Sequence, residues 1–311
     1  MSIAFMYSGQ GAQFKGMGQD ILARYPHLDT FFEEASAITS YDMKAICFED
    51  DEKIHETEYT QPALITIEAM LSQCLHEAGI QADYSLGLSL GEYAALMNAG
   101  ALSYATCMDL IRQRGKIMAE AVPSGLGKMV AVMNTPREQI EAACQEARSE
   151  AGAYVAPANY NTGKQVVIGG YEEAVDLACE KLKEAGSKKL IPLKVSGPFH
   201  TELMKPASEN FKRALELVDF NPPAYPVISN TTARPHDMAH LKENLAKQMY
   251  SPVRWEDSIR YLLDQGVDTF IEIGPGKTLS SFMKQIDRSV ACYRVGDLEN
   301  LEKTINELAG E

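Results

Sequence analysis

The chain has 311 residues, of which 45% are hydrophobic and 23% charged, enough for one large domain or two domains of unequal size. Its 29 basic and 43 acidic side chains give a net charge of −14, which argues against nucleic acid or an anionic membrane as the main partner. The sequence shows no signal-peptide pattern and no run of about 18 apolar residues, so we expect an unexported, soluble protein of the cytoplasm.

The chain before residue 123 begins with a predicted strand, and helical patterns follow it. The apolar run Ile3–Tyr7 predicts a buried parallel strand that ends at the turn Gly9-Gln10-Gly11. Pro62 suits the first position of a helix. Apolar periodicity predicts three helices, over residues 18–37, 62–77 and 104–122.

After a break at Pro123–Gly127, the pattern changes to strand, helix, strand, strand, helix, strand. This is the order of a ferredoxin-like unit, so we predict that residues 124–196 form a small α+β subdomain inserted into a larger α/β domain of residues 1–123 and 197–311. Thr135 and Glu138 fit a capping box at the first helix of the insertion. The predicted strands span residues 128–133, 154–158, 165–169 and 189–195, and the helices 136–151 and 172–185. Beyond the insertion we expect strands over residues 227–229 and 269–273 and a last helix over 298–308.

The six cysteines are far apart and form neither a C-x-x-C pair nor a disulfide framework. We interpret them as buried, reduced thiols, as in a cytoplasmic protein. No spacing of His, Cys and acidic residues is typical of a metal site. The cysteines are Cys47, Cys74, Cys107, Cys144, Cys179 and Cys292.

The segment Gly87–Tyr93 places a serine between two glycines. The glycines allow a sharp strand-to-helix turn that presents the Ser89 hydroxyl and leaves the Leu90 amide free to bind an oxyanion. A G-x-S-x-G pattern arises by chance in roughly one chain of this length in ten, and a simple turn before a helix is the alternative. A serine nucleophile therefore needs partners elsewhere in the sequence.

One histidine stands out as a candidate base. His200 follows an apolar strand, at the strand end where α/β sites assemble, although an interior structural histidine is the alternative. The other five lie in polar contexts, and we expect His236 and His240 at the surface. No acid is obviously placed as a third triad member, but Asp237 and Asp268 are candidates.

Arg114 lies on the apolar stripe of its predicted helix. At roughly 100° per residue it shares a face with the hydrophobic side chains, whereas Arg112 and Lys116 fall on the opposite side. A buried guanidinium needs a partner, which is either an internal acid such as Glu92 or an anionic ligand such as a carboxylate.

Two glycine-rich turns have a partial nucleotide-binding pattern. Gly9-Gln10-Gly11 begins like the dinucleotide-binding pattern G-x-G-x-x-G, but Phe14 occupies the position of the third glycine. Gly274–Thr278 ends like a phosphate-binding loop, but Ile271 occupies the position of the first glycine of that loop. A nucleotide-binding module without catalysis therefore fits the sequence less well. The first turn can still offer the Gln10 amide to a reacting oxygen.

Seven short motifs follow one another along almost the whole chain, and their order is typical of a known family. They are Gly9-Gln10-Gly11-Ala12-Gln13, Tyr59-Thr60-Gln61-Pro62-Ala63, Gly87–Tyr93, Arg114-Gly115-Lys116, Ala158-Asn159-Tyr160-Asn161, Gly197-Pro198-Phe199-His200 and Glu272–Lys277. With these motifs the chain resembles the malonyl-CoA:acyl carrier protein transacylase family, acyltransferases of bacterial fatty-acid synthesis. The resemblance implies a large α/β-hydrolase-like domain with a parallel sheet and an inserted ferredoxin-like subdomain.

The resemblance also implies the catalytic groups. Ser89 is expected to be the nucleophile and His200 its base, with the amides of Gln10 and Leu90 as the oxyanion hole. Arg114 is expected to bind the malonyl carboxylate, which explains an arginine on an apolar face.

Further roles follow from the same resemblance. The backbone carbonyl of Gln248 is expected to orient the histidine in place of a triad acid, and Gln61 and Asn161 to contact substrate. Phe199 fits the pattern of malonyl-selective members. Leu88 departs from the histidine that many members carry before the nucleophile, and we assign its side chain no role.

The implied activity is transfer of malonyl from malonyl-CoA to the phosphopantetheine thiol of an acyl carrier protein, through a malonyl-serine and with no metal or bound cofactor. Two alternatives use the same residues. A free-standing polyketide-synthase acyltransferase differs only in its carrier protein, and a serine thioesterase or esterase passes the acyl group to water.

Overall fold

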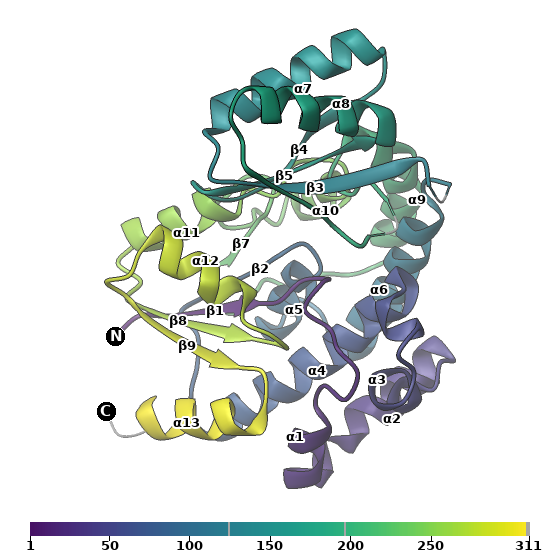
Figure 1. Ribbon diagram of the computed structural model, residues 1–311. Helices are drawn as coiled ribbons and strands as arrows, with labels where there is room; N and C mark the ends of the chain where they lie inside the picture. The colour runs from purple at the N-terminus through teal and green to yellow at the C-terminus, as the bar shows by residue number, and fades with distance from the viewer. Residues whose placement is uncertain (124, 196, 309–311) are drawn as a thin grey trace.

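The computed structural model describes residues 1–123, 125–195 and 197–308. Its strands form two sheets, five parallel strands in sheet A and four antiparallel strands in sheet B (Figure 1). The chain enters sheet A, leaves it for sheet B and then returns, as expected for an insertion. The predicted subdomain borders fall on residues 124 and 196, which lie outside the described residues, and those borders remain a prediction.

Sheet A has the strand order β7-β2-β1-β8-β9. All five residues of β1 are buried, as a central strand covered on both faces requires. The strands are β1 (Ile3–Tyr7), β2 (Tyr84–Gly87), β7 (Val227–Ile228), β8 (Thr269–Ile273) and β9 (Ala291–Val295). The helices before the insertion are α1 (Gln19–Arg24), α2 (Asp29–Thr39), α3 (Met43–Phe48), α4 (Thr57–Glu77), α5 (Gly91–Asn98) and α6 (Tyr104–Glu120). Those after it are α9 (Lys205–Glu216), α10 (Leu241–Gln248), α11 (Trp255–Asp264), α12 (Thr278–Ile286) and α13 (Leu298–Leu308).

Sheet B has the order β4-β5-β3-β6, which is the ferredoxin-like arrangement predicted from the sequence. Its strands are β3 (Gly127–Met133), β4 (Val155–Thr162), β5 (Gln165–Tyr171) and β6 (Lys189–Pro192). Its helices α7 (Arg137–Ala151) and α8 (Glu172–Glu184) cover one face of the sheet (Figure 1).

Alternation along β3 divides its side chains between two cores. Val130 and Val132 pack under α7 and α8, whereas Met129 and Ala131 join the core shared with sheet A. Sheet B therefore turns the face opposite its helices toward the larger part of the molecule.

Three local predictions are wrong. The predicted helix over residues 18–37 is two helices, because Pro26 cannot donate to a continuing helix and Tyr25 before it has φ −124° and ψ 72°. Pro62 lies inside α4, which begins five residues earlier. Thr135 does not cap α7, since its hydroxyl bonds to Met133 and Ser187.

The prediction of free, buried cysteines holds for five of the six. All six are free, and five are buried, while Cys292 is partly exposed. Within the described ranges, no helix is both long and apolar enough to cross a membrane.

Candidate active site

Ser89 occupies a tight turn between β2 and α5. Its φ is +56°, a left-handed conformation that non-glycine residues rarely adopt. A Cβ on Gly87 would lie 1.9 Å from the carbonyl carbon of Gly91, and one on Gly91 would lie 2.4 Å from the Tyr7 oxygen. Both glycines are therefore required by close backbone approach, as the serine motif predicts.

His200 lies beside the serine. Its Nε2 is 2.8 Å from Ser89 Oγ, and its Nδ1 is 2.7 Å from the carbonyl oxygen of Gln248. A carbonyl can only accept, so Nδ1 carries the proton and Nε2 is free to accept the serine proton. Gln248 ends α10, where the last carbonyls of a helix have no partner within it.

Burial keeps this histidine neutral. His200 is 4% exposed, and desolvation, followed by the nearby charge of Arg114, lowers its pKa to about 4, although the Gln248 hydrogen bond acts in the opposite direction. A base that is neutral at physiological pH can accept a proton without first losing one.

The lowered pKa of His200 predicts that kcat/KM changes little between neutral and mildly acidic pH. Protonation removes the acceptor, so kcat/KM should fall only as pH drops through about 4. A histidine with the ordinary pKa of about 6.5 would lose roughly tenfold between pH 7.5 and pH 5.5. We expect kcat/KM at pH 5.5 to lie within about twofold of its value at pH 7.5, with circular dichroism confirming the fold at both. A tenfold loss with the fold intact would contradict this environment for His200.

Arg114 is fully buried on α6, as its position on the apolar stripe predicts. Its guanidinium donates to Gln61 Oε1 at 2.8 Å, to Gln248 Oε1 at 2.9 Å and to Ser89 Oγ at 3.1 Å. The guanidinium carbon also lies over the Tyr93 ring, 5.1 Å from the ring centroid. These acceptors are neutral, and Nε has no hydrogen-bond partner among the residues that the structure describes. Burial lowers the pKa of Arg114, so an anion that neutralises the guanidinium would be stabilised here.

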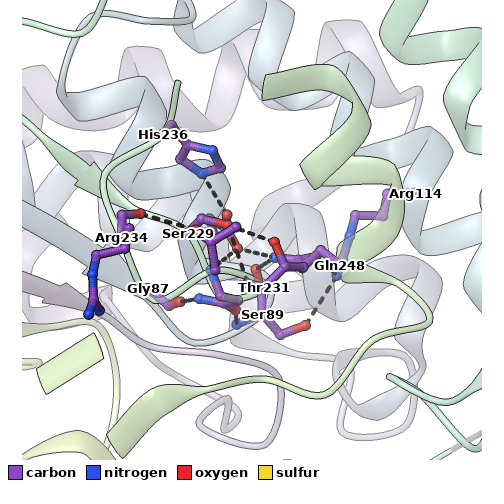
Figure 2. Close-up of polar contacts among 11 residues, drawn as sticks. Gly87, Ser89, Arg114, Ser229, Thr231, Arg234, His236 and Gln248 are labelled. Atoms are coloured by element: carbon purple, nitrogen blue, oxygen red, sulfur yellow. Dashed lines mark hydrogen bonds and ion pairs between the residues drawn. The ribbon is translucent and has the colours of Figure 1, made fainter. Parts of the chain in front are cut away.

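Glu92 is not a direct partner of Arg114, contrary to one of the two alternatives. The Gln248 side chain separates the two charges, because its Oε1 accepts from Arg114 and its Nε2 donates to Glu92 Oε2 at 2.7 Å. Figure 2 shows Gln248 beside both Arg114 and Ser89.

The two predicted oxyanion donors border the same cavity. Among the described residues, neither the Gln10 amide nor the Leu90 amide donates to another backbone group. The Gln10 side chain is occupied elsewhere, since its Nε2 donates to Thr57 Oγ1 at 2.8 Å. Both amides are thus available to an oxygen held near Ser89 Oγ.

A cavity of about 250 Å³ joins these groups between the two sheets. The predicted substrate residues Gln61, Phe199 and Asn161 all line it, and so does Leu88. The Oδ1 atom of Asn161 and the Oε1 atom of Gln165 are buried and find no hydrogen-bond partner within the described part of the chain. Gln165 begins β5 and also lines the cavity, but no sequence motif marks it.

Other sequence candidates are not part of the site. Asp237 is exposed and pairs with His240, and Asp268 is exposed and bonds to the backbone of Ser2, so neither orients His200. The prediction of a surface position holds for His240 but is wrong for His236. The His236 side chain is fully buried against Glu92, with 2.7 Å between Nε2 and Oε1, because the polar loop after β7 folds back over the serine turn.

A known protein family matches almost the whole chain. The family described as the acyl transferase domain matches residues 4–302. This chain belongs to that family. It is therefore an acyltransferase.

Individual members of the family are similar over nearly full length. A malonyl CoA-acyl carrier protein transacylase of Bacillus subtilis is 43% identical, over 99% of this chain and 98% of the relative. The crystal structure of MCAT from Streptococcus pneumoniae has a TM-score of 0.94 and 43% identity, covering 98% of this chain and 100% of that one. A malonyl-transacylase in complex with a type II PKS acyl-carrier protein has a TM-score of 0.95 and 35% identity, covering 99% and 100% of the two chains.

Proposed function

We propose that this acyltransferase moves malonyl from malonyl-CoA to the phosphopantetheine thiol of an acyl carrier protein in fatty-acid synthesis. One observation supports the choice of acyl group: the Arg114 guanidinium donates to Ser89 Oγ at 3.1 Å, and its acceptors within the described ranges are all neutral. A malonyl ester on Ser89 would bring a carboxylate to that unneutralised charge.

In the first half-reaction, His200 Nε2 takes the Ser89 proton as Oγ attacks the thioester carbonyl. The amides of Gln10 and Leu90 stabilise the oxyanion. When the carbon–sulfur bond breaks, the coenzyme A sulfur takes the proton from Nε2, and a malonyl ester remains on Ser89.

The second half-reaction reverses these steps. His200 Nε2 takes the proton of the carrier thiol, and the sulfur attacks the ester carbonyl. Collapse of the tetrahedral intermediate returns the proton to Ser89 Oγ and releases malonyl-carrier protein, a ping-pong scheme. This chemistry uses only groups of the chain and its substrates, and we propose that it needs no metal or bound cofactor. We place it in the cytoplasm, to which the free cysteines are suited.

The proposal is tested by measuring how the malonyl group divides between the carrier protein and water. The protein is mixed with malonyl-CoA and a phosphopantetheinylated acyl carrier protein, and malonyl-carrier and free malonate are both measured. We expect most of the malonyl group to reach the carrier. Malonate as the main product, at a rate that the carrier does not change, would instead indicate the thioesterase alternative.

A polyketide carrier is a second candidate acceptor, because one structural relative is in complex with a type II PKS acyl-carrier protein. Both acceptors use the same active-site chemistry. The ratio of kcat/KM for a fatty-acid carrier and a polyketide carrier, measured with one preparation, decides between them.

A further inference from the structure

Two buried carboxamide side chains hold the backbone of Ser89. Asn230 Oδ1 accepts a hydrogen bond from the Ser89 amide at 2.7 Å, and Gln248 Nε2 donates to the Ser89 carbonyl oxygen at 2.7 Å. Since Ser89 is in a left-handed conformation, these contacts help to hold a turn that the residue itself disfavours.

Asn230 also spans the turn. Its Nδ2 donates to the Gly87 carbonyl oxygen at 2.7 Å while its Oδ1 binds the Ser89 amide. One side chain thereby joins the end of β2 to the serine two residues later. Asn230 is 2% exposed, so water competes little for either contact.

Asn230 is itself fixed by its surroundings. Its backbone amide donates to Glu92 Oε2 at 3.2 Å, and its backbone carbonyl oxygen accepts from the Arg254 backbone amide at 3.0 Å. The other oxygen of Glu92 pairs with His236. Figure 2 shows His236 at one end of this cluster and Ser89 at the other.

We propose that Asn230 is a positioning residue for the nucleophile. Its carboxamide directs the Ser89 hydroxyl toward His200 and, through the same turn, sets the direction of the next amide, that of Leu90. Among the described residues, the hydrogen bonds of Asn230 include none to Ser89 Oγ or to Arg114, so its effect is on geometry rather than on binding. The inference rests on the proposed acylation of Ser89.

Rapid mixing with malonyl-CoA tests this role, since it measures the rate constant and the amplitude of acyl-enzyme formation separately. For Asn230→Ala we expect the rate constant per active molecule to fall about ten- to a hundredfold, because small misplacements of reacting groups have effects of this size. The KM for malonyl-CoA should stay within about twofold, since Arg114 is untouched. A lower amplitude with an unchanged rate constant would show a merely structural role and overturn the proposal.

Thr231→Val is the matched control. Thr231 lies in the same loop, and among the described residues its hydroxyl bonds only to Ser229 Oγ and not to the serine turn, so the wild-type rate constant is expected. Where Asn230→Ala yields no folded protein, Asn230→Ser replaces it, because a serine is too short to reach both Ser89 and Gly87. A wild-type protein that forms no acyl-enzyme would refute the proposed function itself, which is a different outcome from a normal rate constant in the variants.

Discussion

Replacing Ser89 with alanine is expected to lower malonyl transfer by about 10⁴-fold or more, because no other group can form the covalent intermediate. Intact mass spectrometry after mixing with malonyl-CoA should show one added malonyl group on the wild-type protein and none on Ser89→Ala.

The fold should survive this substitution. Asn230 and Gln248 bind the backbone of position 89, and alanine keeps those contacts. A thermal midpoint close to that of the wild type is the control that separates lost chemistry from lost folding. An adduct that persists in Ser89→Ala would refute the nucleophile assignment.

Replacing Arg114 with alanine is expected to reduce the preference for malonyl over acetyl by about ten- to a hundredfold. This corresponds to the roughly 1.5 to 3 kcal/mol of a charge-assisted hydrogen bond to the malonyl carboxylate, which acetyl lacks. The measurement is the ratio of kcat/KM for malonyl-CoA to that for acetyl-CoA.

The ratio is chosen because Arg114→Ala should also destabilise the protein. It leaves the carboxamide oxygens of Gln61 and Gln248 without their donor, at about 1 to 3 kcal/mol each. A smaller folded fraction lowers both rates equally and cancels in the ratio. Arg112→Ala is the matched control, since Arg112 lies on the outer side of the same helix and pairs with Asp109. Equal losses for the two substrates would contradict the role of Arg114.

Local regularities of the sequence predicted the main features of the fold. The order of strands and helices after residue 127 was sufficient to predict the arrangement of sheet B. Strands and helices can be told apart in a sequence because their hydrophobic residues recur with different periods. Arg114 was identified as unusual in the same way, since its place on an apolar stripe depends only on helix geometry. Errors came where a local signal was ambiguous: Pro62 suits a helix start, but it lies within α4.

The partners of each functional group depended on tertiary structure. The carboxamides on Arg114 come from positions 53 and 134 residues away in the chain, and Asn230 is 141 residues from the amide it binds. Asn and Gln are common surface residues, and no periodicity marks the few that are buried. His236 illustrates the same limit, because its polar neighbours suggested a surface position that the folded loop contradicts. The sequence by itself determined the elements and the residue types of the site, because these depend on local geometry. Only the tertiary structure decided which neutral amides surround the arginine and hold the serine turn, because those hydrogen bonds form between distant segments once both are buried.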